Sequence, residues 1–361
     1  MSHPVPSLGA LRGQEPACRR LAALADLPAG EPVPPLLLHG PDGVGKRTAA
    51  LAFAAALACT ERGPGEAPCG RCRGCARVSA AEGVTALREG ASSTREAPRV
   101  YPDVGIVSVP RGRSRISILQ ARDLILSARE RPFELPRRIY VVEPADLLTP
   151  EAANSLLKIL EEPPPTTALV LVTASPWSLP ITVRSRLQAI RFRALPPRVI
   201  REILVERGVD PADAERRAAL AGGSVGRALV LDPDTIAADR DSWIDLLARI
   251  AADPADAAAA AVAAGERWGG STGQAREALS LLLALLRDLA ALAEGAAVPD
   301  PGTPSRLASL AGAATRLLGP TFERAREVDT LRRELDTIHR NPRLALEGAV
   351  LLLAGYPVTR S

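Results

Sequence analysis

The chain has 361 residues, of which 47% are hydrophobic and 24% are charged, and its 45 basic and 41 acidic side chains give a net charge of +4. These values exclude a disordered or fibrous protein and predict about two or three folded domains. Aromatic residues make up only 3%, so recognition of single-stranded nucleic acid by stacking is not expected. The small positive charge permits contact with phosphate backbones but is equally typical of a mixed, solvated surface.

The apolar runs of the chain are too short to cross a membrane. The longest, residues 279–286, is far below the ~20 residues that a spanning helix needs. The start of the chain has no basic cluster followed by an apolar segment, which is the pattern of a signal peptide. We therefore expect a cytoplasmic protein with reduced thiols.

Short apolar runs in the first half of the chain predict buried parallel strands. They lie at residues 34–39, 104–109, 139–142, 168–173 and 188–192. An Ala/Leu-rich helix is expected over 47–57. Between the third and fourth runs, residues 149–161 begin with a threonine cap and a proline and carry one apolar face, which predicts a single helix. This alternation predicts an α/β domain with a parallel five-stranded sheet over residues 1–194.

Strand signals cease after residue 194. Short helical patterns at 199–207, 211–221 and 224–231 predict a small helical domain over residues 195–234. Longer patterns predict an all-helical domain over residues 235–361, including helices at 254–262, 274–294 and 322–339. Residues 82–98 and 295–304 are rich in loop-forming residues and are expected to be loosely structured.

The loop after the first predicted strand matches the phosphate-binding pattern G-x-x-x-x-G-K-[ST] except at its last position. It contains Gly40, Gly43 and Gly45, which allow the backbone to turn, and Lys46, which supplies a charge for phosphates. Arg47 stands where a serine or threonine hydroxyl would bind magnesium, and Thr48 lies about 100° further around the helix and cannot replace it. The loop remains suited to phosphate, so binding of ATP or ADP stays an open alternative.

A nucleotide-hydrolysing site also needs two carboxylates at the end of a following strand, one to hold magnesium and one to polarise water. Glu143 stands at the first position after the third predicted strand, but Pro144 occupies the second. Proline can neither bind the metal nor accept a proton. We therefore expect this site to lack water activation, and we interpret Asp146 as a polar residue at the strand end.

The cysteines predict a metal site. The pattern C-x-x-C-x-x-C has a further cysteine upstream, which gives the set Cys59, Cys69, Cys72 and Cys75. Four thiolates match a closed tetrahedral zinc site, which is structural because no coordination position stays open. An iron–sulfur cluster also takes four thiolates, and uncoordinated thiols are a further alternative. We favour a zinc module at residues 59–75 and interpret Cys18 as an ordinary helix residue.

Basic residues cluster at Arg111, Arg113 and Arg115, just before a helix expected to begin near Ser117. Arginines at a helix N-terminus suit DNA phosphates. A solvated loop is the commoner explanation of such a cluster. The histidines of the chain are isolated in sequence and suggest no metal or catalytic site.

Several stretches together resemble the bacterial clamp-loader branch of the AAA+ family. They are GQEP at 13–16, the loop GPDGVGKRT, the cysteine module, YPD at 101–103, EAANSLLKILEEPP at 151–164 and VRSR at 183–186. The resemblance covers about residues 13–232. It implies an AAA+ phosphate-loop domain with an inserted zinc module, a small helical lid domain and a helical collar domain for oligomerisation.

Within that family, the departures at Arg47 and at Glu143 and Pro144 resemble the delta prime branch, whose members have lost hydrolysis. Gly226 also fits this branch, since it stands where a hydrolysing subunit carries a sensor arginine. In the family, a Ser-Arg-Cys motif supplies an arginine finger to a neighbour's ATP. Ser185-Arg186-Leu187 resembles it except at the third residue, so Arg186 is the candidate finger, and a surface or salt-bridged arginine is the alternative.

The resemblance implies a stator in a ring of clamp-loader subunits. Its partners would be gamma/tau and delta subunits, the sliding clamp, and primed DNA through the assembled complex. One alternative is a gamma/tau-type subunit that hydrolyses ATP itself. Another is a zinc-bearing DNA-binding protein unrelated to replication, which would bind duplex DNA alone in a salt-sensitive manner.

Overall fold

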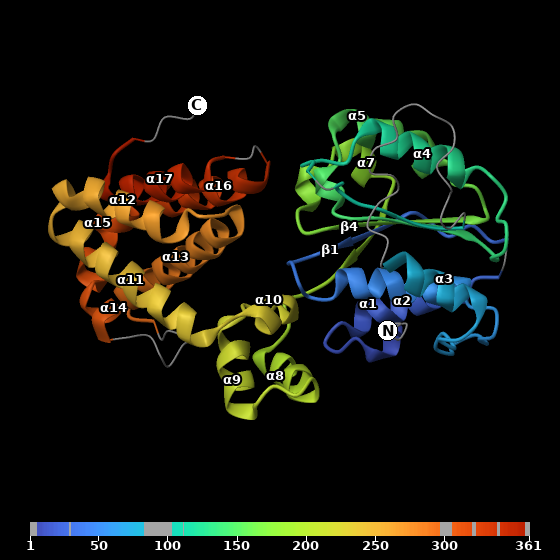
Figure 1. Cartoon of the computed structure of the whole chain (residues 1–361), viewed down its shortest axis with the longest axis horizontal. Helices are drawn as coiled ribbons and strands as arrows, with labels where there is room; N and C mark the ends of the chain where they lie inside the picture. Colours follow the sequence, from blue (N-terminus) through green and yellow to red (C-terminus); the bar gives the residue numbers. More distant parts are fainter. Residues whose placement is uncertain are drawn as a thin grey trace. The chain divides into compact units, whose positions relative to one another are not determined.

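The computed structural model describes residues 6–28, 30–82, 103–110, 112–296, 305–319, 323–337 and 340–357. The chain divides into two compact units, Met1–Leu231 and Asp232–Ser361 (Figure 1). Nearly all of the expected loose segment at 82–98, and most of that at 295–304, lies outside the described residues. The first unit holds both the sheet and the short helices that follow it, and the division into three domains stays a prediction.

The first unit is built on a parallel five-stranded sheet in the order β2-β3-β4-β1-β5. Its strands are β1 Leu36–His39, β2 Val104–Val107, β3 Arg138–Val142, β4 Thr167–Thr173 and β5 Gln188–Arg191. The near-continuous apolar runs arise because a parallel sheet is covered on both faces, so residues of either parity are buried. All the strands expected from the sequence are present, and the α/β fold class is confirmed.

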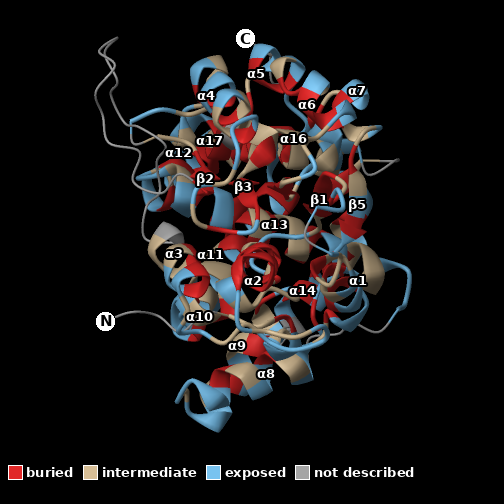
Figure 2. Cartoon of the chain, turned by 90° about the vertical axis from the view of Figure 1, so that its right-hand side faces the viewer, coloured by how far each residue is buried: buried red, intermediate tan, exposed pale blue. Residues whose placement is uncertain are grey.

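Helices cover both faces of this sheet. On one side lie α1 Glu15–Ala25, α2 Lys46–Ala58 and α3 Arg73–Glu82, and on the other lie α4 Ile118–Ala128, α5 Pro150–Ser155, α6 Leu157–Glu161 and α7 Ile181–Arg184 (Figure 1). In β1, Leu36 and Leu38 face the first group while Leu37 faces the second, as strand alternation requires. Helix α2 is buried at every residue except Arg47 and Thr48, and Figure 2 shows it mostly in red.

The helix expected at 149–161 is broken in two, so the prediction of one continuous helix was wrong. Thr149 caps it as expected, since its hydroxyl accepts the amide of Ala152. The amide of Leu156 then donates to the carbonyl of Ala153, a three-residue spacing, and the Ser155 hydroxyl donates to Ala152 at 2.7 Å. Such bonding from a serine to the preceding turn tightens and bends a helix. The two halves α5 and α6 result.

The remaining elements are helical. In the first unit, α8 Pro197–Glu206, α9 Pro211–Leu220 and α10 Val225–Val230 form a small core of their own, close to the expected ranges. The second unit consists of α11 Pro233–Ala252, α12 Ala257–Trp268, α13 Thr272–Ala293, α14 Ser305–Ser309, α15 Ala314–Leu318, α16 Glu323–Thr337 and α17 Pro342–Ala354. Short 3-10 turns lie at Leu8–Ala10, Ala145–Leu147, Pro176–Ser178, Pro254–Asp256 and Ala311–Ala313. Within the described residues, the helices are all too short or too polar to span a membrane.

Candidate phosphate-loop site and cysteine cluster

The glycine loop follows β1 and leads into α2, in the expected order of strand, loop and helix. Its glycines have positive φ angles, +146° at Gly40, +68° at Gly43 and +98° at Gly45, the N-cap residue just before α2. A Cβ atom on Gly40 would lie 2.2 Å from the carbonyl oxygen of Phe192. The loop therefore needs glycine for both conformation and space, and it ends at a helix N-terminus, which favours anions.

Lys46 lies within the loop and is only 6% exposed. Its Nζ donates to the carbonyl oxygens of Gly40 at 2.7 Å and Pro41 at 2.6 Å, and the Asp42 carboxylate is 3.6 Å away. Burial lowers the pKa of Lys46, and the carboxylates of Asp42 and Glu143 oppose that shift. Phosphate oxygens could replace the two carbonyls as acceptors, so the ammonium stands where the sequence pattern requires it.

Arg47 and Glu143 form an ion pair, with Nη1 and Oε2 2.7 Å apart. The structure thus joins the two residues that replace the usual magnesium-binding groups, although they are 96 positions apart in the chain. Thr48 and Pro144 line the same cavity. Asp146 has a different partner, because it accepts the hydroxyl of Thr173 at the end of β4.

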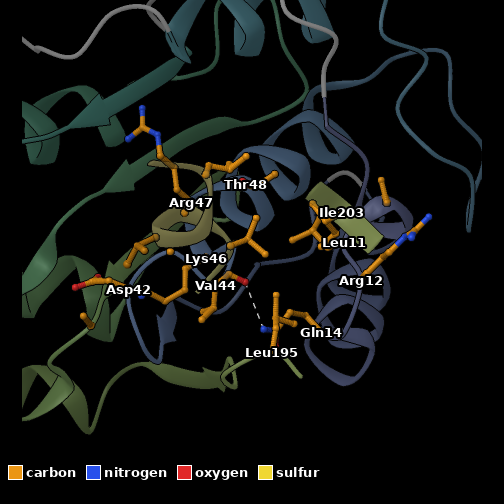
Figure 3. Close-up of a pocket in the computed structure, with 18 of the residues that line it drawn as sticks. Leu11, Arg12, Gln14, Asp42, Val44, Lys46, Arg47, Thr48, Leu195 and Ile203 are labelled. Carbon is orange, nitrogen blue, oxygen red and sulfur yellow. Dashed lines mark hydrogen bonds and ion pairs between the residues drawn. The ribbon is translucent and has the colours of Figure 1, made fainter. Parts of the chain in front are cut away.

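A cavity of about 490 Å³ opens beside the loop, within the size range of ligand pockets. Beyond Lys46 the lining is largely apolar, and Figure 3 shows Leu11 and Ile203 close to each other with the charged Arg12 nearby; Glu206 and Arg207 also line the cavity. The apolar lining comes from the segment before α1, from β4, from the chain between β5 and α8, and from helices α8 and α10: Ala10, Leu11, Val172, Leu195, Ile203, Val225 and Leu229. The sequence pattern located the polar end of this cavity and gave no signal for the apolar end.

Gln14 positions the glycine loop. It lies within the GQEP motif, but no sequence pattern indicated this role. It is 3% exposed, and its amide nitrogen donates to the carbonyl oxygens of Arg193 at 2.7 Å and Val44 at 3.4 Å (Figure 3). Its amide oxygen accepts the backbone N–H of Arg193 at 3.1 Å. Gln14 therefore ties the glycine loop to the chain just beyond β5.

Gly226 contacts the glycine loop directly. Its backbone N–H donates to the carbonyl oxygen of Gly43 at 2.9 Å, and a Cβ atom on Gly226 would lie 3.0 Å from the Cα of Gly43. A Cβ atom on Gly43 would lie 2.2 Å from the hydroxyl oxygen of Ser224. The start of α10 therefore rests on the loop backbone to backbone, and an added side chain at Gly226 would require the loop to shift slightly.

We expect Gly226→Ala to loosen this contact. The new methyl would press on backbone atoms that cannot rotate away, at a cost of about 1–3 kcal/mol, while the better helix propensity of alanine returns less than about 1 kcal/mol. Hydrogen exchange should quicken in peptides covering residues 40–45 and 221–231. Gly9→Ala is the matched control, since nothing lies within 4 Å of its added Cβ. Unchanged protection in Gly226→Ala would contradict the expectation.

Arg186 follows α7 and is paired within the chain. Its Nε donates to Oε1 of Glu161, at the end of α6, at 2.5 Å, and its Nη1 donates to the carbonyl oxygen of Thr182 at 2.6 Å. Its side chain is 32% exposed. The next residue, Leu187, is buried in the core between the sheet and α4 to α7, which explains an apolar residue where the motif has cysteine. Arg186 is thus accessible and also salt-bridged.

The four cysteines converge. Their Sγ atoms all lie within 4.8 Å of one another, and those of Cys59 and Cys72 are 3.7 Å apart. Zn–S bonds of about 2.3 Å in a tetrahedron place sulfurs about 3.8 Å apart. A cluster with several irons would spread its thiolates over separate metal atoms and hold some of them further apart. The arrangement fits a single metal ion, so the cluster is a site that could hold a metal.

The thiols of the cluster differ in their surroundings. Burial raises the pKa of Cys72, but hydrogen bonds from the backbone of Cys75 and Thr60 and from the side chains of Cys75 and Cys69 together bring it to about 6. Burial raises the pKa of the Cys75 thiol. The amides of Cys69 and Cys72 point at the sulfurs of Cys59 and Cys69. Burial raises the pKa of Cys18, outside the cluster, to about 11, in keeping with an inert core residue.

The cysteine cluster is attached firmly to the α/β core. Cys59 directly follows α2, and Arg62 donates to the carbonyl oxygens of Ala56 and Ala25 and pairs with Asp26 at 2.9 Å. Gly74 packs so closely against the end of α2 that a Cβ would lie 1.9 Å from the carbonyl oxygen of Ala58. The cluster therefore extends the core and is not a separate appendage.

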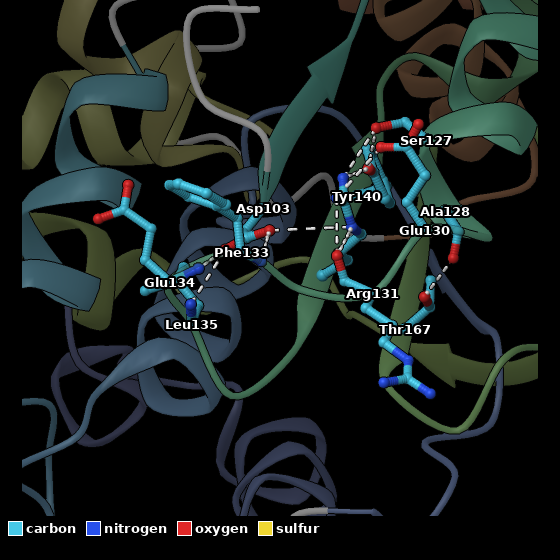
Figure 4. A network of polar contacts seen from close by, with 11 residues as sticks. Asp103, Ser127, Ala128, Glu130, Arg131, Phe133, Glu134, Leu135, Tyr140 and Thr167 are labelled. Carbon is cyan, nitrogen blue, oxygen red and sulfur yellow. Dashed lines mark hydrogen bonds and ion pairs between the residues drawn. The ribbon is translucent and has the colours of Figure 1, made fainter.

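Asp103, the only described residue of the YPD motif, has a structural role. Its carboxylate accepts the backbone N–H groups of Phe133, Glu134 and Leu135 at 2.7–3.0 Å (Figure 4). Glu134 in turn pairs with Arg77 on α3 at 2.8 Å. The motif thus fixes the loop before β3 against the helix that carries Cys75.

The basic cluster at 111–115 gains no support as a DNA site. Arg111 lies outside the described residues. Ser117 caps α4 as expected, and it does so with a reciprocal bond to Gln120. Its hydroxyl therefore serves the helix, and the binding of DNA by this cluster stays untested.

Comparison with known proteins gives a consistent set of relatives for the first unit. Residues 25–196 match the family described as DNA polymerase III, delta subunit. A DNA polymerase III subunit delta' of Bacillus subtilis is 35% identical over 175 residues, which cover 48% of this chain and 46% of that protein. A subunit gamma/tau of Mycobacterium tuberculosis is 31% identical over 192 residues, which cover 53% of this chain and 29% of that protein.

The solved structure of a DNA polymerase III gamma subunit-related protein of Thermotoga maritima gives a TM-score of 0.40 at 14% identity, covering 93% of this chain and 98% of that one. In sequence, the matched region spans less than half the length of either curated relative. The family-model match, residues 25–196, includes the glycine loop, the cysteine cluster and Arg186, and it ends before α8.

Proposed function

We propose that the chain is a delta prime subunit of the DNA polymerase III clamp loader, starting from the match of residues 25–196 to the DNA polymerase III, delta subunit family and from its delta' relative. In this role it is a stator that joins gamma/tau and delta subunits, does not hydrolyse ATP itself, and presents Arg186 to the ATP of a neighbouring gamma/tau subunit. The assembled complex loads the sliding clamp on primed DNA.

The observation that carries this proposal is the ion pair between Arg47 and Glu143. Hydrolysis needs a metal ion on the β- and γ-phosphates and a group that orients the attacking water. Here the two residues at the metal position neutralise each other at 2.7 Å, and Pro144 supplies no base. Relatives of both the delta' and the gamma/tau kind match this chain, and the ion pair favours a subunit of the delta' kind.

The accessible Arg186 supports a contribution in trans. A guanidinium offers five N–H donors; here Nε and Nη2 contact Glu161, and Nη1 contacts Thr182 and Ser185, so phosphate oxygens would bind partly by replacing these exposed contacts. An arginine finger acts by stabilising charge that develops on the transferred phosphoryl group. The role of the second unit as the oligomerisation collar is part of the same proposal, as is zinc in the cysteine cluster.

The isolated chain is expected to show no ATP turnover, with or without clamp and primed DNA, because the water-activating position is proline. Phosphate release measured at high enzyme concentration tests this. Turnover that disappears in Lys46→Ala would favour a gamma/tau-type subunit instead. Reconstitution with gamma/tau and delta subunits, followed by a clamp-loading assay with and without this chain, tests the stator role itself.

A further inference from the structure

The residues around the glycine loop do not fit a magnesium ion. Magnesium requires near-octahedral oxygen ligands at about 2.0–2.1 Å. Of the groups at its usual position, Arg47 has no acceptor atom, Pro144 has no side-chain oxygen, and Glu143 already accepts the Arg47 guanidinium at 2.7 Å. Thr48 lines the cavity, but it comes one residue after the metal-binding position and lies about 100° further around α2.

The same residues remain suited to phosphate. Lys46 is held in the loop by two carbonyls, and the N-terminus of the 13-residue α2 faces the loop. Arg47 uses Nη1 for Glu143 and has further N–H donors on the guanidinium, whose side chain is 37% exposed. A metal ion normally neutralises part of the phosphate charge, and a guanidinium beside the loop can do the same without oxygen ligands.

We propose that this loop binds a nucleoside diphosphate or triphosphate without a divalent cation, with Arg47 taking the place of the metal. The apolar end of the 490 Å³ cavity receives the base, and Lys46, Arg47 and the loop amides hold the phosphates. On binding, Lys46 exchanges the carbonyls of Gly40 and Pro41 for phosphate oxygens. The inference rests on the proposed function only in taking this loop as one that does not hydrolyse its nucleotide.

Titration of the full chain with ADP and with ATP, by calorimetry, tests this inference in excess magnesium and in excess EDTA. We expect the two dissociation constants to agree within about twofold. Arg47→Thr should make binding magnesium-dependent by about tenfold or more, the equivalent of 1.4 kcal/mol. Glu143→Gln should tighten binding in EDTA and in magnesium, because it removes a negative charge beside the phosphates, whereas loss of a metal-holding carboxylate would weaken binding in magnesium.

Lys46→Ala is the control that places the ligand in the loop, and it should weaken binding under both conditions. The inference is overturned if the wild-type chain binds nucleotide about tenfold more tightly with magnesium, if Lys46→Ala leaves binding unchanged, or if neither nucleotide binds. These outcomes concern the chain alone. The stator role is tested by Arg186→Ala in the assembled complex. The nucleotide-binding inference and the stator proposal can therefore be contradicted independently of each other.

Discussion

Replacing Arg186 with alanine is expected to slow ATP hydrolysis at the adjacent site of a reconstituted complex by about a thousandfold or more, as loss of an arginine finger does in other phosphoryl-transfer systems. The measurement is single-turnover hydrolysis by the complex of this chain with gamma/tau and delta subunits, in the presence of clamp and primed DNA. The fraction of ATP sites that hydrolyse slowly should correspond to the single site beside this chain.

The cost of releasing Arg186 from its present partner is small. Its side chain is 32% exposed and that of Glu161 is 47% exposed, and pairs this exposed contribute about 0–1 kcal/mol. A neighbour's triphosphate carries several charges and would compete easily for the guanidinium. Loss of the pair should therefore leave folding and ring assembly intact, and size-exclusion chromatography of the Arg186→Ala complex checks this.

Two variants separate the finger from the general charge of this surface. Arg184→Ala removes an arginine whose guanidinium stacks over Trp177 at 4.3 Å, and it should leave hydrolysis unchanged. Glu161→Gln frees Arg186 from its ion pair and should keep the rate at least at the wild-type level. Hydrolysis that stays at the wild-type rate in Arg186→Ala would show that this arginine is only a surface residue.

The elements that were predictable from the sequence are those whose signal is local. Each parallel strand is a short apolar run, because helices cover both faces of the sheet, and the glycine loop is marked by residues that need positive φ. The helix at 149–161 was only partly predictable. Its cap is a local signal, but the break at Leu156 depends on a serine hydroxyl turning back on its own backbone, which the pattern of apolar residues does not reveal.

The missing metal-binding and water-activating groups of the site were predictable from the sequence. The contacts between the residues that replace them were not. Arg47 and Glu143 each depart from a motif, yet their pairing joins positions 96 residues apart and depends on the sheet bringing β1 beside β4 and β4 beside β3. In the sequence, Gly226 was of interest because it stands where a hydrolysing subunit carries a sensor arginine. In the structure, its missing side chain is what lets α10 bond to Gly43, a packing role without any sequence signal.

Cys72→Ser is expected to remove the metal and to lower the stability of the first unit. Metal content, measured by mass spectrometry on protein purified under reducing conditions, should be one zinc per wild-type chain and close to none in the variant. Structural zinc sites bind with apparent free energies of about 10–16 kcal/mol. Even a loss of a few kcal/mol moves the Tm of a unit this size by roughly 10 °C, at about 2–4 °C per kcal/mol.

The effect should spread beyond the cluster, because Arg62 and Gly74 bind the cysteine segment to the ends of α1 and α2. Cys18→Ala is the control: Cys18 is a buried thiol in the core beneath α1, outside the cluster, so metal content should stay at one. Iron in place of zinc would identify the alternative cluster. Retention of one metal per chain in Cys72→Ser would contradict the four-thiolate site, because three sulfurs would then suffice to hold the ion.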